Sequence, residues 1–199
     1  MWVIKIGGSL AQAALLPQCL ATLAADRTRR WVVVPGGGPF AEAVRGLQAH
    51  WGFPDGPAHR MAVQAMGIYG LALHALAPTL PVASSVSAVA SATRSVIWAP
   101  AAVELLGLAE NWRVCADAIA LWLAQQLGAQ GVILLKSAPP PQPAHSALDL
   151  AALGYLDAAF PELLGAADCP AFWTLPADLL RAGSAELDPP GSARRILPA

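Results

Sequence analysis

The stretch Trp2-Val3-Ile4-Lys5-Ile6-Gly7-Gly8-Ser9-Leu10 decides the fold, because it joins a short apolar strand directly to a glycine turn. A second apolar run, Trp31-Val32-Val33-Val34, leads into the turn Pro35-Gly36-Gly37-Gly38 in the same way. Consecutive glycines after a strand adopt backbone conformations that a side chain forbids, and their amides can approach an anion closely. The two turns predict two phosphate positions in one crevice, formed by Gly7, Gly8, Ser9, Gly36, Gly37 and Gly38. Ordinary tight turns between a strand and a helix are the alternative, because they have the same composition.

Apolar runs alternate along the chain with alanine- and leucine-rich segments of helical spacing. The runs are apolar on successive residues, which is typical of strands covered on both faces. They lie at residues 2–6, 31–34, 80–83, 96–99, 132–135 and 171–174. The helical segments lie at 11–25, 40–51, 59–77, 117–127 and 176–181. This order predicts one α/β domain over residues 1–199, a three-layer αβα sandwich with a mainly parallel central sheet and ligands beyond the carboxyl ends of its strands.

The composition argues against several kinds of protein. Apolar residues make up 56% of the chain and charged residues 13%, so we expect another subunit to cover part of the surface, as in a homo-oligomer. A net charge of -1 without a long basic run argues against a nucleic-acid partner. The uncharged stretch between Arg60 and Arg94 is broken by glycines and prolines, which argues against a membrane span. The three cysteines lack the spacing of a disulfide framework or a zinc site. The first segment has the pattern of a strand and not of a signal peptide, so we expect a cytoplasmic protein.

Three ionisable residues are candidates for catalysis: Lys5, Asp117 and Lys136. An unpaired ammonium inside an apolar strand is costly, so Lys5 is expected to leave the end of the sheet or to meet an anion. Taken alone, Asp117 fits a helix cap and Lys136 fits a solvated residue at a strand end. Two lysines in one crevice repel each other unless an acid lies between them, and Asp117 can fill that role. Two ammonium groups held by one carboxylate stabilise the charge of a transferring phosphoryl group, which predicts a phosphotransferase.

Together, Ile4-Lys5-Ile6-Gly7-Gly8-Ser9-Leu10, Val34-Pro35-Gly36-Gly37-Gly38 and Cys115-Ala116-Asp117 resemble the amino acid kinase family in order and spacing. The resemblance implies the fold of that family and transfer of the γ-phosphoryl group of ATP to a carboxylate or a phosphate. Mg²⁺ would be carried in with the nucleotide, and no protein ligand for a metal is expected. The resemblance also implies that Lys5 contacts the transferring group, that the glycines cradle it and that Asp117 orients the lysines.

A narrower resemblance covers residues 58–70 (AHRMAVQAMGIYG), 111–117 (NWRVCAD) and 134–137 (LLKS). These stretches are similar to the branch of the family that contains the kinase of methanofuran-type cofactor synthesis. The resemblance implies a small phosphorylated acceptor, [5-(aminomethyl)furan-3-yl]methyl phosphate, which is converted to the diphosphate in methanofuran or methylofuran biosynthesis. It also implies an acceptor pocket along one helix, with contacts from His59, Arg60, Ala62 and Met66. Methionines at helical spacing fit core packing as well.

Two other functions fit the sequence. A kinase of a carboxylate, of the N-acetylglutamate or aspartate type, would use an arginine for bidentate pairing, and Arg60, Arg94 and Arg113 are available. The second alternative is a non-catalytic subunit, which keeps the fold and binds a nucleotide or oxyanion. Asp157 fits either a helix cap or a site residue, and Pro139-Pro140-Pro141-Gln142-Pro143 is expected to form a stiff loop beside the site.

Overall fold

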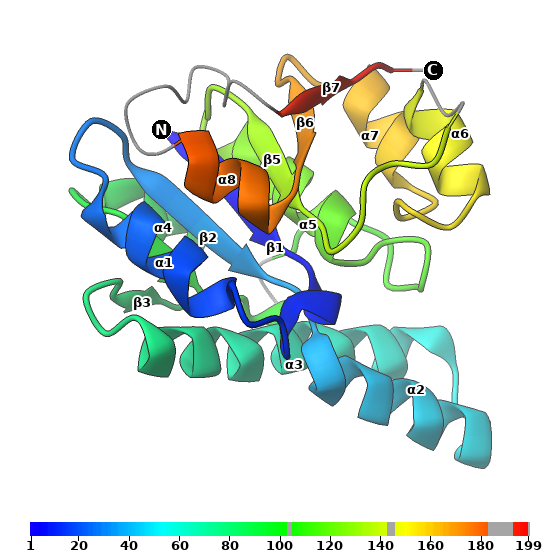
Figure 1. Cartoon of the computed structure of the whole chain (residues 1–199). Helices are drawn as coiled ribbons and strands as arrows, with labels where there is room; N and C mark the ends of the chain where they lie inside the picture. Colours follow the sequence, from blue (N-terminus) through cyan, green and yellow to red (C-terminus); the bar gives the residue numbers. More distant parts are fainter. Residues whose placement is uncertain (103–104, 143–145, 183–192, 199) are drawn as a thin grey trace.

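The computed structural model describes residues 1–102, 105–142, 146–182 and 193–198. Its centre is a seven-stranded sheet in the order β3-β4-β2-β1-β5-β6-β7 (Figure 1). Neighbouring strands are parallel except for β7, which runs antiparallel to β6. The strands are β1 (Trp2–Ile6), β2 (Trp31–Pro35), β3 (Val82–Ala83), β4 (Val96–Trp98), β5 (Val132–Leu135), β6 (Ala171–Thr174) and β7 (Arg194–Ile196).

Helices cover both faces of this sheet (Figure 1). They are α1 (Leu16–Ala25), α2 (Gly38–Trp51), α3 (Asp55–Leu76), α4 (Val86–Ser91), α5 (Ala116–Gln126), α6 (Ala147–Ala152), α7 (Phe160–Gly165) and α8 (Pro176–Ala182), with a 3₁₀ helix η1 (Gly8–Leu10). Side chains of α5 and α7 pack with Val3 and Leu134 on one face, whereas those of α1 and α8 pack with Ile4 and Ile133 on the other. The predicted α/β sandwich with a mainly parallel sheet is therefore confirmed.

The central strands have the burial that their sequences predict. Every residue of β1, β2, β5 and β6 is buried, and this includes Lys5. Strands covered on both sides have no solvent face, so their apolar runs are continuous rather than alternating. For this reason the runs at 2–6, 132–135 and 171–174 coincide with β1, β5 and β6 at the predicted bounds.

Some elements differ from the prediction. The helix expected over residues 11–25 begins only at Leu16, because residues 11–15 form turns and Pro17 fits the first helical turn. The strand expected over 80–83 is reduced to two residues at the edge of the sheet. Two of the three residues of β7 are arginines, so it has no apolar signal, and backbone pairing with β6 defines it. Helices α4, α6 and α7 have six residues each, too few for a periodic pattern.

Helices α2 and α3 pack against each other and extend beyond the rest of the molecule (Figure 1). Helix α2 ends at Trp51 and is capped by Gly52, whose left-handed φ of 68° lets its amide donate to the carbonyl of Gln48 at 2.8 Å. Helix α3 then runs for 22 residues and contributes Met66 to the core on the α5 face and Leu73 to the core on the opposite face. In the described part of the chain, no helix combines the length and the apolar character needed to cross a membrane.

The two glycine turns lie against each other at the carboxyl ends of β1 and β2. The amide of Gly36 donates to the carbonyl of Ile6 at 2.8 Å. A Cβ on Gly8 would lie 2.7 Å from the amide nitrogen of Gly38, and a Cβ on Gly36 would lie 2.7 Å from that of Gly8. Side chains do not approach backbone atoms so closely, so the turns can touch only with glycine at these positions.

Gly36→Ala should destabilise the protein by about 1–3 kcal/mol, because the new methyl group forces the turns apart. The matched control is Gly46→Ala inside α2, where an added Cβ meets nothing within 4 Å. There alanine should stabilise the helix by roughly 0.5–1 kcal/mol. Urea unfolding measures both changes, and equal effects of the two substitutions would contradict the close contact of the turns.

Candidate active site

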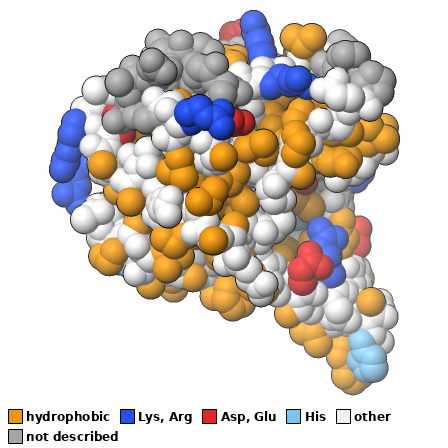
Figure 2. Space-filling view, viewed as in Figure 1, with side chains coloured by type: hydrophobic (Ala, Val, Ile, Leu, Met, Phe, Trp, Pro, Cys, Tyr) orange, Lys and Arg blue, Asp and Glu red, His pale blue; other side chains and the backbone are white. Residues whose placement is uncertain are grey.

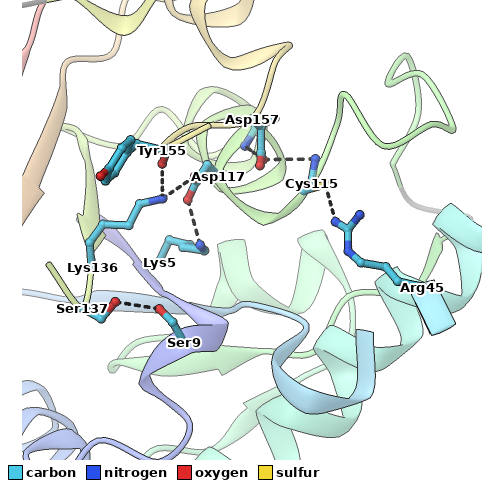
Figure 3. A network of polar contacts seen from close by, with 10 residues as sticks. Lys5, Ser9, Arg45, Cys115, Asp117, Lys136, Ser137, Tyr155 and Asp157 are labelled. Carbon is cyan, nitrogen blue, oxygen red and sulfur yellow. Dashed lines mark hydrogen bonds and ion pairs between the residues drawn. The ribbon is translucent and has the colours of Figure 1, made fainter. Parts of the chain in front are cut away.

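One buried carboxylate joins the two lysines of the sequence (Figure 3). Asp117 Oδ1 lies 2.8 Å from Lys5 Nζ, and Asp117 Oδ2 lies 2.6 Å from Lys136 Nζ. Lys5 is a residue of β1, Asp117 belongs to the first turn of α5, and Lys136 follows β5 directly. Because β1 and β5 are parallel neighbours, both lysines reach the same end of α5. The structure thus brings together the three residues that the sequence predicts as a group.

Burial and mutual charge set the protonation of this group. Only 7% of Lys5 and 3% of Asp117 is exposed. Burial acts to raise the pKa of Asp117, but the charges of Lys5 and Lys136 hold it below its ordinary value, so the carboxylate stays ionised. Burial is the largest influence on Lys5 and acts to lower its pKa, but the charges of Asp117 and Asp157 and the hydrogen bond to Asp117 together outweigh it, so the pKa of Lys5 is raised. At Lys136 burial prevails over the attraction of Asp117 and the pKa is lowered.

Further contacts hold Lys136 in place. Its ammonium donates to the carbonyl of Tyr155 at 2.9 Å and lies 5.3 Å from the ring centroid of Trp173. Trp173 Nε1 in turn donates to the carbonyl of Ala138 at 3.1 Å, which ties the start of the proline segment to β6. Residues 139–142 follow without helix or strand, as the sequence predicts, whereas Pro143 lies outside the described residues.

A cavity of about 540 Å³ opens beside Lys5, between the glycine turns and helices α2 and α3. In Figure 2 a hollow separates the body of the molecule from these projecting helices. Of the predicted site residues, those that line the cavity are Lys5, Gly8, Ser9, Gly36, Gly37, Gly38, His59, Ala62 and Met66. Gly7, Asp117 and Lys136 do not line the cavity. Asp117 is nevertheless connected to it, because it forms an ion pair with Lys5, which does line the cavity. Ser9 Oγ lies 3.0 Å from Ser137 Oγ and so links the first turn to the chain after β5.

Arg60 is the predicted acceptor contact that the structure places away from the cavity. Its guanidinium pairs with Glu110, and 49% of its side chain is exposed. Arg60 follows His59 about 100° further around α3, and its side chain is directed to Glu110 instead of the cavity. Of this pair of predicted contacts, His59 lines the cavity and Arg60 does not, and a contact of either with the acceptor stays a prediction.

His59 is a buried polar side chain in the cavity wall. Only 3% of the residue is exposed, and neither ring nitrogen has a hydrogen-bond partner within the described part of the chain. Burial lowers the pKa of His59 against a smaller opposing effect of the Val114 carbonyl, so the ring is neutral near pH 7. A neutral imidazole has one N–H donor and one acceptor nitrogen, and here both nitrogens are buried in the wall of the cavity.

Sequence reasoning missed the outer wall of the cavity. The guanidinium of Arg45 lies 3.8 Å from the centroid of the Trp112 ring, and its Nη2 lies 3.7 Å from Cys115 Sγ. Arg45 Nε also lies 3.8 Å from a carboxylate oxygen of Glu42. These residues come from separate segments, and no local pattern links position 45 to position 112. The one available signal was the position of Trp112 inside the 111–117 stretch that resembles known kinases.

Asp157 is both a helix cap and a cavity residue. Its Oδ2 accepts from the amide of Cys115 at 3.1 Å and from the amide of Ala118 at 2.9 Å, so it caps α5 and not a helix of its own segment (Figure 3). The side chain also lines the cavity beside Lys5. Burial, together with the charge of Asp117, raises the pKa of Asp157 to about 6.

Comparison with solved structures identifies the class of this fold. The uridylate kinase of Archaeoglobus fulgidus has a TM-score of 0.69 at 16% identity, over 94% of this chain and 97% of the other. The UMP kinase of Bacillus anthracis has a TM-score of 0.65 at 17% identity, over 88% and 87%. The aspartate kinase of Synechocystis has a TM-score of 0.64 at 16% identity, over 100% of this chain and 40% of the other. The fold is that of the amino acid kinases, so the resemblance read from the sequence is confirmed.

A particular relative emerges from the sequence comparison. The [5-(aminomethyl)furan-3-yl]methyl phosphate kinase of Methanocaldococcus jannaschii is 34% identical over 71 residues. The matched stretch spans 35% of this chain and 33% of that relative. No protein-family profile matches the chain. This relative and the structural neighbours named above are all kinases.

The raised pKa of Asp157 makes stability depend on pH with a defined sign. An unfolded aspartate has a pKa near 4, so between about pH 4 and pH 6 the folded chain keeps a proton that the unfolded chain has released. Stability therefore falls as the pH rises through this window. Asp157→Asn keeps an oxygen for both backbone amides but cannot ionise.

The free energy of unfolding of Asp157→Asn, relative to that of the wild type, should be about 2 kcal/mol higher at roughly pH 7.5 than at roughly pH 4.5. The reason is that only the wild type has to ionise a buried carboxyl group as the pH rises. Urea unfolding of both proteins at the two pH values measures this gain. Titration of His59 contributes equally to both curves and cancels in the difference. A stability difference that is the same at both pH values would contradict the raised pKa.

Proposed function

We propose that the protein is an ATP-dependent kinase that phosphorylates a small phosphate monoester. The observation that carries this proposal is the pair of lysines held by one buried carboxylate, at the end of the sheet where the two glycine turns touch. Cations and backbone amides that are fixed in advance stabilise the charge on the equatorial oxygens of a transferring phosphoryl group. The likeness to known kinases in fold and in partial sequence supports the same reaction.

In the proposed reaction, a phosphate oxygen of the acceptor attacks the γ-phosphorus of ATP. A new P–O bond forms while the bond to the β,γ-bridging oxygen breaks, which gives ADP and the acceptor diphosphate. The attacking oxygen is already anionic, so no side chain has to remove a proton. Lys5 contacts the transferring group and Asp117 keeps that lysine in place. Mg²⁺ carried in with the nucleotide would neutralise charge on the phosphates of ATP. We keep the cytoplasm as the predicted compartment for this reaction.

The two substrates are assigned to opposite sides of Asp117. Lys136 stands on the β5 side, away from the cavity lining, and we assign it to the phosphates of ATP. The cavity beside Lys5, walled by α2 and α3, is assigned to the acceptor. Lys5 lines the cavity and shares the carboxylate with Lys136, so it is the residue placed to serve both substrates.

The chemistry of the cavity supports an acceptor that carries an amine as well as a phosphate. Ala62 and Met66 give one wall an apolar surface that suits a flat ring. Glu42 and Asp157 bring two carboxyl groups, which suit an ammonium group. His59 adds one donor and one acceptor. [5-(Aminomethyl)furan-3-yl]methyl phosphate, named for the archaeal relative, has all three features, and we propose it as the acceptor.

A carboxylate acceptor has less support. Arg60, Arg94 and Arg113, which the sequence offers for bidentate pairing with a carboxylate, do not line the cavity. Arg45 does line it, but its guanidinium is stacked on Trp112. A phosphate held by Lys5 and by backbone amides needs no such arginine.

We also propose that the protein is a homo-oligomer that pairs through α3. Ile68, Leu71 and Leu76 are each half exposed or more, and their spacing places them on one side of that helix. On α2, Leu47 and Trp51 are also exposed, at 49% and 71%. A two-fold axis through α3 would bring the same apolar side of two copies together.

Leu71→Glu should convert the oligomer to monomers, because it puts a charge at the centre of the proposed contact. Leu148→Glu on α6 is the matched control, since Leu148 is 58% exposed and Leu71 57%. Light scattering coupled to gel filtration gives the molar mass of each. A monomeric wild type, or equal dissociation of both variants, would refute pairing through α3.

The reaction is tested by measuring ADP release from Mg-ATP with and without the furan phosphate. Lys5→Ala should lower kcat by at least about 10²-fold, because a cation at the transferring group is lost. Arg113→Ala removes the same charge from an exposed position off the cavity and should keep wild-type rates.

His59→Phe should raise KM for the acceptor about tenfold with little change in kcat, because it removes a contact made by the bound acceptor.

Each other outcome points to a different function. Release of ADP with N-acetylglutamate or aspartate in place of the furan phosphate would favour the carboxylate kinase. ATP binding seen by calorimetry, without turnover of any of these acceptors, would favour the non-catalytic subunit. Turnover that survives Lys5→Ala would refute the role given to that lysine.

A further inference from the structure

A second cavity, of about 560 Å³, lies at the opposite end of the sheet from the glycine turns. Three loops form it: residues 26–30 before β2, residues 79–80 before β3 and residues 93–95 before β4. These strands are parallel, so the loops meet at the amino ends, whereas the candidate active site lies at the carboxyl ends. Figure 2 shows basic side chains along the left edge of the molecule, where Figure 1 places the loop between α1 and β2.

Arginines are concentrated around this cavity. Arg27, Arg29, Arg30 and Arg94 line it, and they are a third of the twelve basic residues of the chain. Asp26 is the acidic residue in the described lining, so the lining carries an excess of three positive charges. The chain as a whole has a formal net charge of -1, so this excess is local. Arginine stays charged at every physiological pH.

The carboxylate of Asp26 is occupied within its own loop. Its Oδ1 accepts from the amide of Thr28 at 2.8 Å, from the hydroxyl of Thr28 at 2.7 Å and from the amide of Arg29 at 3.2 Å. Its Oδ2 accepts from Trp31 Nε1 at 2.9 Å. Only 6% of Asp26 is exposed. These bonds shape the loop and occupy both carboxylate oxygens, and Asp26 forms no ion pair with Arg27, Arg30 or Arg94 in the described part of the chain.

Arg27 and Arg94 are the arginines available to a ligand. Arg29 lies 3.7 Å from Asp26, and Arg30 donates to two backbone carbonyls around the end of α4. Arg27 and Arg94 come from different loops, are exposed, and have no hydrogen bond or ion pair with the part of the chain that the structure describes. Like charges that share one cavity repel each other, and a bound anion removes that repulsion.

A buried hydroxyl adds a donor to the same cavity. Ser95 is 8% exposed, and its Oγ accepts from the amide of Trp31 at 3.0 Å, which leaves its hydroxyl hydrogen free to donate. The apolar side chains of the lining are limited to Ala24 and Leu80. The cavity therefore suits charge and hydrogen bonding better than the burial of a ring.

We propose that this cavity is a second anion site, which binds a di- or triphosphate group away from the reaction. Guanidinium groups bind phosphate oxygens in bidentate fashion, and two of them on separate loops match the adjacent charges of a polyphosphate. The volume lies in the range of small-molecule sites. The proposal is independent of the proposed kinase activity, because it uses none of the residues around Asp117.

Pyrophosphate is the probe, titrated by calorimetry at low ionic strength into Lys5→Ala, which lacks one of the two lysines of the reaction site. Binding should persist there and should weaken at least tenfold when Arg27→Gln and Arg94→Gln are added. The matched control adds Arg181→Gln and Arg195→Gln, which remove the same charge from exposed positions outside the cavity. The same pairs in the otherwise wild-type chain repeat the comparison, and circular dichroism confirms that each variant is folded.

Three results would overturn the proposal. Pyrophosphate binding that disappears in Lys5→Ala would assign the anion to the reaction site. Equal affinity with and without Arg27 and Arg94 would show that the cavity binds no anion. Equal loss in both double variants would show a general effect of charge, without a site.

Discussion

The rest of the structure depends on the two bonds that Asp117 makes to lysines. A carboxylate and two ammonium groups can be buried at this depth only together, because breaking a buried ion pair costs about 3–5 kcal/mol. Their meeting requires β1 and β5 to be neighbours and α5 to begin above the end of that pair. The central place of β1 in the sheet and the position of α5 therefore serve one electrostatic arrangement.

A short segment between α6 and α7 supports this arrangement. The carbonyl of Tyr155 accepts from Lys136, and two residues later the carboxylate of Asp157 accepts from the first turn of α5. One segment thus orients both the helix that carries Asp117 and the lysine bound to it. Asp157 bears a cost for this position, because burial beside Asp117 disfavours its charge.

The fold could be predicted because its strongest signals are local. The apolar runs of β1, β5 and β6 are continuous, and the glycines directly follow β1 and β2. Lys5 and Asp117 could be paired from the sequence, because charges inside apolar segments must meet a partner. Strand β7 could not be found, because it depends on pairing with β6 and has no apolar signal of its own.

Parts of the site depend on contacts between distant segments, and these were beyond prediction. Arg45 and Trp112 meet only because α2 and the segment before α5 border the same cavity. Asp157 could be recognised as a cap, but not as the cap of a helix some forty residues earlier. Nor could the sequence show that Arg60 pairs with Glu110, fifty residues later, outside the cavity that its neighbour His59 lines.

The use of lysine in this chain has a consequence for its covalent chemistry. Both lysines of the sequence are bonded to Asp117, and every other basic side chain apart from histidine is an arginine. Lysine is the residue that acetylation and amine-directed reagents modify, whereas arginine is left unchanged. Acylation of any lysine in this chain therefore falls on the ion-paired centre and removes one of its charges. Modification of lysine side chains accordingly reports on the accessibility of that centre, without a background from surface lysines.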